Sequence, residues 1–129
     1  MKQEYLEKIG EKGQLIVVSG PIGTGKKTII QEYLKEHENA RVSISATTRE
    51  PYAGEEDGKD YWFVSYLEFE RMIRTRQMLE YSYVNNYAYG TPKKAVEDAR
   101  EKGHNVILDV DAVGAMRVRT LCPDATLIY

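Results

Sequence analysis

The chain has 129 residues, enough for one domain with a hydrophobic core and too few for two independent domains of ordinary size. Its 18 Lys and Arg residues nearly balance 20 Asp and Glu residues, which gives a net charge of -2. This balance offers no basic field that could hold nucleic acid, so we expect no nucleic-acid partner and only local phosphate recognition.

The amino-terminal segment and the cysteine content indicate in which cellular compartment the protein is expected. Met1 to Lys12 is charged throughout and lacks the apolar run of a signal peptide, and no apolar run approaches membrane-spanning length. Cys122 is the only cysteine, so an internal disulfide is excluded, which suits a reducing environment. We expect a cytoplasmic protein without a membrane partner, either a monomer or a homodimer.

A glycine-rich loop between an apolar strand and a helix is the strongest local pattern. Leu15 to Val18 is a continuous apolar run, typical of a buried parallel strand, and Lys26 to His37 has a helical period that places Ile29 on an inner face. Glycines in the loop let backbone N–H groups converge on an anion, and the helix adds the positive end of its dipole. The residues expected to bind the phosphates of ATP are Gly20, Pro21, Ile22, Gly23, Thr24, Gly25, Lys26, Lys27 and Thr28.

This loop departs from the Walker pattern at one position. In that pattern the lysine is followed directly by Ser or Thr, whose hydroxyl binds Mg²⁺, whereas here Lys26 is followed by Lys27 and the hydroxyl comes at Thr28. Lys26 is expected to supply the point charge for the β- and γ-phosphates, and Thr28 is a weak candidate for a metal ligand. The alternative is a glycine turn without a nucleotide.

A long polar segment interrupts the alternation of strands and helices. It runs from Ala46 to Asp60, between strands predicted at Val42–Ser45 and Tyr61–Val64, and its polar and turn residues exclude it from a core. A loop of this length in a compact domain usually carries function. Ser65 followed by Glu68 then forms a capping box, which predicts the start of a helix.

The next elements also have recognisable ends. Extended segments are predicted at 79–84 and 87–90. Thr91 is predicted to cap the following helix, with Pro92 at its first position and Gly103 just beyond its end.

A second buried strand is predicted at Val106–Val110. It is apolar until Asp109 and Asp111 appear at its carboxyl end, where an open α/β sheet places its site. We therefore expect this strand to lie beside Leu15–Val18, with Lys26 near Asp109 at one edge of the sheet. The remaining predicted elements are a helix at Val113–Leu121 and a strand at Ala125–Tyr129.

Taken in this order, the motifs resemble the guanylate kinase family, whose enzymes transfer phosphate from ATP to GMP. The resemblance runs from about Leu15 to Tyr129. The segment Ser43-Ile44-Ser45-Ala46-Thr47-Thr48-Arg49-Glu50-Pro51, followed by Gly54-Glu55, Gly58 and Asp60-Tyr61, is similar to the GMP-binding segment of the family. Further matches are Leu79-Glu80-Tyr81, Tyr89-Gly90-Thr91-Pro92, and Leu108-Asp109-Val110-Asp111 with Gly114.

The resemblance implies an α/β fold, a three-layer P-loop kinase fold with a parallel sheet and an inserted GMP-binding lobe. Residues 1–44 and 92–129 would form the P-loop core of this single domain, and residues 45–91 would form the lobe. Family members continue beyond the position of Tyr129 into a lid that supplies arginines to the transferring phosphate, so we expect the chain to be incomplete at its carboxyl end.

The resemblance also implies a phosphate end and a base end of the GMP site. Arg49 would pair with the GMP phosphate as a planar fork, and the hydroxyls of Tyr61 and Tyr89 would donate to the same phosphate. Lys26 and Arg49 would be the catalytic residues, acting on ATP and GMP respectively.

At the base end, Glu80 would accept from guanine N1–H and the 2-amino group, while Ser45 and Thr91 would reach the base edge. Adenine lacks this pair of donors, so a carboxylate selects guanine. Asp111 would lie beside the bound GMP, and Asp109 would help to hold Mg²⁺ through its water shell.

The sequence leaves two further functions open. Tyr52 stands where the family usually has a second phosphate-binding arginine, and Val113 where it usually has glutamine. These departures and the missing lid favour a guanylate-kinase-like binding module with weak or no catalysis, whereas Lys26 and the intact glycines favour the enzyme. An unrelated P-loop ATPase or small-metabolite kinase is the third hypothesis.

Overall fold

The computed structural model describes residues 12–20 and 25–128. The chain divides into two compact units: unit 1 consists of residues 1–43 and 95–129, and unit 2 of residues 44–94. Four residues of the expected phosphate loop, Pro21, Ile22, Gly23 and Thr24, lie outside the described residues. Within the described part of the chain, no helix has the length and apolar character needed to cross a membrane.

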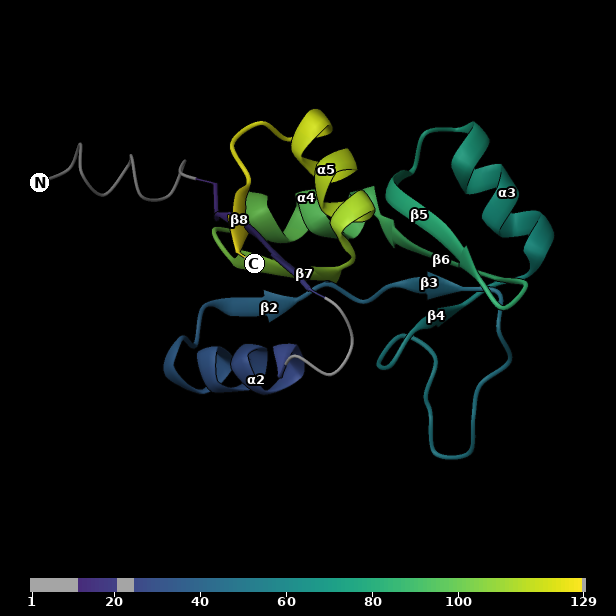
Figure 1. The fold of residues 1–129 in the computed structure, drawn as a ribbon, viewed down its shortest axis with the longest axis horizontal. Coiled ribbons are helices and arrows are strands. Elements are labelled where there is room, and N and C mark those ends of the chain that lie inside the picture. Colours follow the sequence, from purple (N-terminus) through teal and green to yellow (C-terminus); the bar gives the residue numbers. More distant parts are fainter. Residues whose placement is uncertain (1–11, 21–24, 129) are drawn as a thin grey trace, which may run out of the picture. The chain divides into compact units, whose positions relative to one another are not determined.

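Unit 1 is built on a four-stranded parallel sheet with the order β2-β7-β1-β8 (Figure 1). The register pairs Leu15 with Val106 and Ser19 with Val110, which confirms that the two buried strands are parallel neighbours. The strands are β1 (Leu15–Ser19), β2 (Ala40–Val42), β7 (Asn105–Val110) and β8 (Thr126–Ile128).

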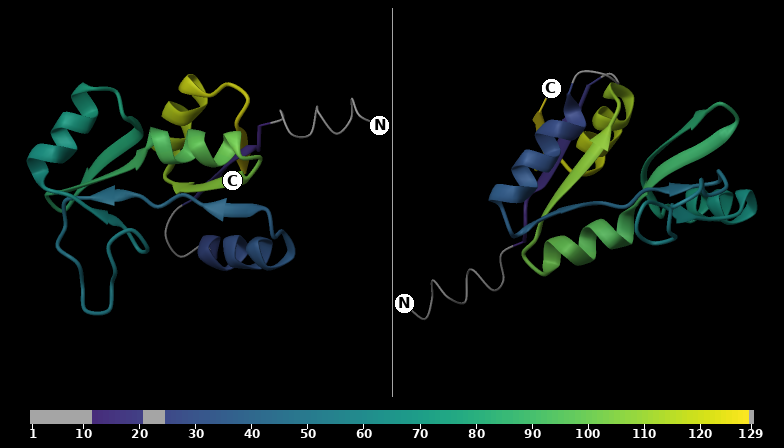
Figure 2. Two further views of the ribbon diagram at one scale, coloured as in Figure 1. Left: turned by 180° about the vertical axis from the view of Figure 1, so that it is seen from behind. Right: turned by 90° about the horizontal axis from the view of Figure 1, so that it is seen from below.

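Helices cover both faces of this sheet. Figures 1 and 2 show α2 (Lys26–Glu36) on one face and α4 (Lys93–Glu101) and α5 (Ala112–Leu121) on the other. Side chains of a pleated strand alternate between the two faces of the sheet. Because both faces are covered, the two central strands β1 and β7 are apolar at every central position. Ile16 of β1 packs against Ile30 of α2, whereas the neighbouring Val17 is fully buried outside that cluster. The three-layer α/β fold is therefore confirmed.

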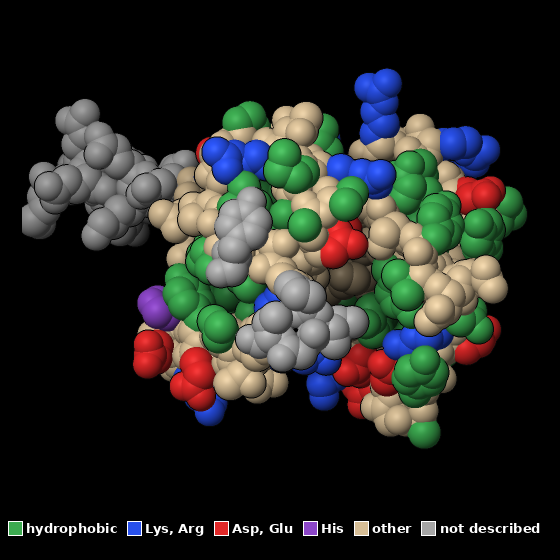
Figure 3. All heavy atoms as spheres, viewed as in Figure 1, with side chains coloured by type: hydrophobic (Ala, Val, Ile, Leu, Met, Phe, Trp, Pro, Cys, Tyr) green, Lys and Arg blue, Asp and Glu red, His purple; other side chains and the backbone are tan. Residues whose placement is uncertain are grey.

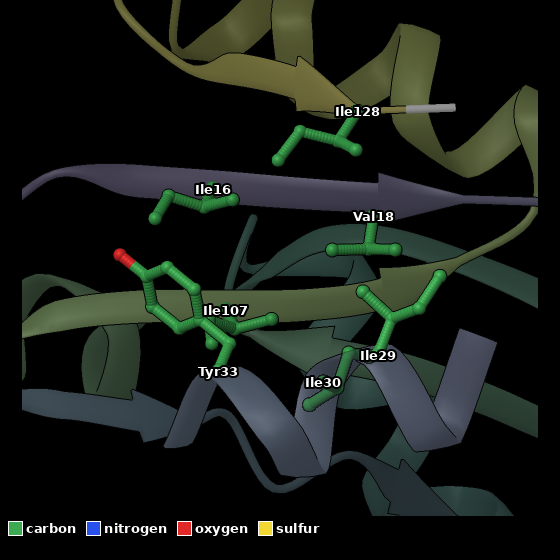
Figure 4. A pocket seen from close by; sticks show the side chains of 7 residues that line it. All are labelled: Ile16, Val18, Ile29, Ile30, Tyr33, Ile107 and Ile128. Carbon is green, nitrogen blue, oxygen red and sulfur yellow. The ribbon is translucent and has the colours of Figure 1, made fainter. Parts of the chain in front are cut away.

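A small apolar cavity of about 50 Å³ lies beside α2 (Figure 4). It explains why Ile29, expected on the inner face of this helix, is 60% exposed: the side chain points into a cavity that opens to solvent. Every lining side chain is apolar apart from one tyrosine, so the cavity lacks the polar groups that recognise a nucleotide base. Its lining consists of Ile16, Val18, Ile29, Ile30, Tyr33, Ile107 and Ile128.

Unit 2 is a four-stranded mixed sheet with the order β4-β3-β6-β5, packed on one helix. The helix is α3 (Tyr66–Arg74), and its Phe69 forms a core with Ala46, Met78 and Ala88 of the sheet. The predicted cap is confirmed, because Ser65 Oγ accepts from the N–H of Glu68 at 3.0 Å. The strands are β3 (Ala46–Thr47), β4 (Trp62–Phe63), β5 (Met78–Val84) and β6 (Tyr87–Pro92).

Two sequence predictions about these elements are wrong. Thr91 and Pro92 do not begin a helix but end strand β6, because Thr91 pairs with Glu80 in the ladder and α4 begins at Lys93. The strand expected at Val42–Ser45 is split, since β2 ends at Val42 and β3 begins at Ala46 in the other unit.

A bulge at the start of β5 decides which side chains face α3. Met78 pairs with Pro92 and Glu80 with Thr91, so two steps along β5 match one step along β6. Residues two apart on a regular strand share a face, and the extra residue reverses this rule. Met78 therefore joins the core under α3, while Glu80 lies opposite Thr91 on the other face.

Candidate active site

One face of the unit 2 sheet carries buried polar side chains. The core residues Ala46 and Ala88 face α3, and Gly90 does so as well, because an added Cβ would approach Phe69 Cζ to 3.0 Å. The alternate positions on β6, Tyr89 and Thr91, belong to the opposite face. The buried polar residues of unit 2 are Thr47, Arg49, Glu80 and Thr91.

The base end of the expected site contains a buried carboxylate. Glu80 is 8% exposed and Thr91 is 1% exposed, and Thr91 Oγ1 donates to Glu80 Oε2 at 2.8 Å. A carboxylate has acceptor capacity for several hydrogen bonds, so it can accept from more than one donor at a time. Ser45 is half-buried, and its carbonyl accepts from the N–H of Trp62 at 2.8 Å.

The phosphate end is organised by Arg49, whose side chain is only 8% exposed. Its guanidinium makes a two-pronged contact with Glu55, with Nη1–Oε1 at 2.8 Å and Nη2–Oε2 at 3.2 Å. Nη1 also donates to the carbonyl of Glu50 at 3.0 Å. The hydrogen bond to Glu55 raises the pKa of Arg49 above its ordinary value, and a hydrogen bond with Tyr89 adds to this effect.

Aromatic rings surround the same guanidinium. Its carbon lies 3.7 Å from the ring centre of Tyr52, 5.2 Å from that of Tyr61 and 5.9 Å from that of Phe63. The rings of Tyr61 and Tyr89 meet edge to face with centres 6.1 Å apart. Arg49, Tyr61 and Tyr89, three residues of the expected phosphate end, therefore form one cluster within unit 2.

Two members of this cluster received no site role from the sequence. Glu55 is part of the Gly54-Glu55 motif, and Tyr52 is one of the positions where the chain departs from the family pattern. Only the structure shows that both side chains contact Arg49. The available signal was an acidic residue six positions after a buried arginine, across a turn that contains proline and glycine.

In unit 1, Lys26 and Asp109 meet directly. Lys26 Nζ lies 2.6 Å from Asp109 Oδ1 and donates to the carbonyl of Gly20 at 3.0 Å. The parallel pairing of β1 and β7 brings their carboxyl ends to the same edge of the sheet, and α2 starts with Lys26. The predicted proximity of Lys26 and Asp109 is confirmed.

The amino terminus of α2 differs from those of α3 and α5. Ser65 caps α3, and Asp111 caps α5 by accepting from the N–H of Gly114 at 2.7 Å. At α2, in contrast, no side chain of the described residues provides a cap, and the first turn holds no acidic residue. Gly25 precedes this helix in the left-handed conformation, with φ of 82°. Uncapped N–H groups at a helix start favour an anion.

The possible metal ligands are few. Among residues 12–20 and 25–128, no group of three or more His, Cys, Asp or Glu side chains is arranged to hold a metal ion. Mg²⁺ that is carried by nucleotide phosphates needs only one or two protein carboxylates, and Asp109 is a carboxylate beside Lys26. Lys27 and Thr28 are both exposed on the first turn of α2.

Together, the parallel sheet, the glycine-rich sequence after β1 and the lysine at the start of α2 define an α/β protein of the P-loop class. Comparison with known proteins gives the family. The guanylate kinase family model matches residues 12–129, so the chain belongs to the guanylate kinase family.

Individual relatives agree with this assignment. Guanylate kinase of Clostridioides difficile is 45% identical over 92% of this chain, and that of Latilactobacillus sakei is 49% identical over 94%. The crystal structure of guanylate kinase from Anaplasma phagocytophilum superimposes with a TM-score of 0.72 at 31% identity, over 93% of this chain. The chain spans 58% and 60% of the lengths of the two bacterial relatives and 60% of that solved chain.

Proposed function

We propose that this chain is the nucleotide-binding part of a guanylate kinase, which transfers the γ-phosphate of ATP to GMP to give ADP and GDP. Unit 2 would be the GMP-binding lobe. The observation that carries this proposal is the set of buried polar side chains in unit 2, which includes a carboxylate on strand β5 and, just after strand β3, an arginine within an aromatic cluster.

The two ends of GMP have matching partners in unit 2. Arg49, Tyr61 and Tyr89 supply donors for a phosphate, and a charged donor makes the stronger kind of hydrogen bond. Glu80 and Thr91 supply an acceptor and a hydroxyl for the base edge. A buried carboxylate that accepts from the donors of guanine would discriminate against adenine, which offers none at the matching positions.

Unit 1 would hold the phosphates of ATP. The uncapped start of α2 and the ammonium group of Lys26 both favour an anion there. Lys26 now pairs with Asp109, so we expect it to turn to the β- and γ-phosphates when ATP binds, leaving Asp109 to the metal-water shell. Mg²⁺ bound with ATP would neutralise charge on the transferring phosphoryl group.

The reaction itself is a substitution at the γ-phosphorus. An oxygen of the GMP phosphate forms a new P–O bond while the bond to the β-phosphate oxygen breaks, and ADP leaves. The contribution of this chain would be position and charge, which are the main sources of catalysis in phosphoryl transfer.

The test is binding and turnover with purified chain. Calorimetry with GMP, AMP and guanosine measures selectivity, and chromatography of a mixture with ATP, Mg²⁺ and GMP detects GDP. We expect GMP to bind more tightly than AMP and GDP to form slowly. Binding of GMP without any GDP would instead support a binding module, and equal affinity for GMP and AMP would contradict both.

A further inference from the structure

We propose that Glu55 is a positioning residue that holds the Arg49 guanidinium in the orientation needed for phosphate, with the Tyr52 ring fixing one face of it. This inference rests on the proposed GMP site and names the residues that prepare its phosphate end. The starting observation is that Arg49 is already engaged on one side by the two-pronged contact with Glu55.

The hydrogen bonds of Arg49 to Glu55 and to Glu50 leave one particular edge of the guanidinium facing away from them. A guanidinium has five N–H donors, and three of them point to Glu55 and to the Glu50 carbonyl. The other two, one on Nε and one on Nη2, lie parallel on a single edge. Such an edge matches two oxygens of a phosphate. The hydroxyl of Tyr89 also hydrogen-bonds to Arg49, so a bound phosphate would share this edge with it.

Tyr52 and Glu55 hold each other as well as Arg49. The backbone N–H of Tyr52 donates to Glu55 Oε1 at 2.7 Å, and its ring lies over the guanidinium at 3.7 Å. The ring stacks there although Tyr52 is 66% exposed. Glu55 thus fixes the rotation of the guanidinium in its own plane, and the ring limits movement out of that plane.

Electrostatic repulsion alone predicts that the Glu55 carboxylate weakens GMP binding, whereas the positioning role predicts that it strengthens GMP binding. The loop between β3 and β4 carries five acidic residues, Glu50, Glu55, Glu56, Asp57 and Asp60, against two basic ones, Arg49 and Lys59, and Figure 3 shows acidic side chains gathered over it. A negative charge next to Arg49 repels a phosphate dianion, so its removal should strengthen GMP binding if Glu55 only competes for the arginine. If Glu55 positions Arg49, the same removal should weaken GMP binding.

The decisive variant is therefore Glu55→Gln, with Glu56→Gln as a control of equal charge change one residue away on the exposed side of the loop. Calorimetry with GMP and with guanosine separates phosphate recognition from base recognition. We expect Glu55→Gln to lower GMP affinity about tenfold and to leave guanosine affinity unchanged. Glu56→Gln should leave GMP affinity equal to or slightly above that of the parent chain.

A second measurement does not depend on nucleotide binding. The Nε–H signal of Arg49 in ¹⁵N relaxation experiments reports how rigidly the guanidinium is held, and it should be ordered in the parent chain and mobile in Glu55→Gln. Tyr52→Ala should lower GMP affinity by about two- to fivefold, the size of one exposed cation–π contact.

The outcomes separate this inference from the proposed function. Equal or tighter GMP binding by Glu55→Gln, or an Arg49 Nε–H as ordered as in the parent, would overturn the positioning role. A parent chain that binds guanosine and GMP equally would instead overturn the phosphate end of the proposed site. In that case, if the Arg49 Nε–H is ordered in the parent and more mobile in Glu55→Gln, the result would still support the inference that Glu55 orders the arginine side chain.

Discussion

Lys26 Nζ and Asp109 Oδ1 are 2.6 Å apart, so the side chain expected to hold ATP phosphate is neutralised by the side chain expected to hold the metal shell. Both groups are partly open to solvent, with 16% and 29% of the side chains exposed. A ligand can therefore reach them, and it must separate the pair. A nucleotide that arrives with Mg²⁺ offers a new partner to each group at once.

This relationship gives a prediction for Asp109→Asn. Free ATP should bind the variant more tightly than the parent, because Lys26 no longer has to leave a carboxylate. Mg²⁺ should then improve ATP binding less than it does for the parent, because the metal shell has lost a charged ligand. Calorimetric titrations with and without Mg²⁺ measure both effects, and Glu32→Gln, a carboxylate of α2 loosely paired with Lys35, serves as control. Unchanged ATP binding under both conditions would contradict a role of the Lys26–Asp109 pair in binding ATP or its metal.

Glu80→Gln should reduce guanine selectivity. The amide keeps an oxygen for the hydroxyl of Thr91, but its NH₂ group meets the donors of the base. We expect GMP binding to weaken by about 1–3 kcal/mol, and the preference for GMP over IMP, which lacks the 2-amino group, to shrink. Competition binding with both nucleotides measures this, and Glu70→Gln on exposed α3 should retain the preference of the parent.

Phe69→Ala should destabilise unit 2 strongly. Phe69 is 1% exposed and joins α3 to the sheet, so removal of its ring leaves a cavity that costs about 3–5 kcal/mol. Leu67→Ala is the matched control on the same helix, because Leu67 is 75% exposed and should change stability by less than about 0.5 kcal/mol. Urea unfolding followed by the fluorescence of Trp62, the single tryptophan, reports on this unit.

The contribution of Glu55 to stability should depend on pH. Its pKa lies below the ordinary value of 4.5 because Arg49 and the N–H of Tyr52 hydrogen-bond to the carboxylate. The folded state then binds the proton more weakly than the unfolded state, so the stabilisation is complete above the unfolded pKa and is lost as the pH falls through the lowered folded pKa. The difference in unfolding free energy between parent and Glu55→Gln should be smaller at pH 3 than at pH 7. A difference that grows on acidification would contradict this sign.

The sequence was sufficient for the elements that have strong local signals. The two central strands are continuous apolar runs because helices cover both faces of the sheet, and the cap at Ser65 depends only on residues three apart. The proximity of Lys26 and Asp109 followed from parallel strands ending at one edge. These features are local or follow from a general rule of topology.

The features that the sequence could not give depend on pairing between distant segments. Thr91 and Pro92 have the composition of a helix start, but the ladder with β5 holds them in a strand. The bulge at Met78 and Glu80, which turns Glu80 away from the core, has no glycine or proline on β5 itself, and its partner Pro92 has the sequence context of a helix start. The contact of Arg49 with Glu55 depends on how the intervening turn closes, which is a property of the folded loop.

The strand order β2-β7-β1-β8 also determines when the parts of the chain can fold during synthesis. Strands β1 and β2 are made early but do not touch, because β7 lies between them and is complete only at Val110. All strands of unit 2 lie between residues 44 and 94 and are therefore available before β7. On the ribosome, the unit proposed to select GMP can thus acquire its structure first, whereas Leu15–Ser19 gains its partner strand, and with it the proposed phosphate site, only after β7 has been made.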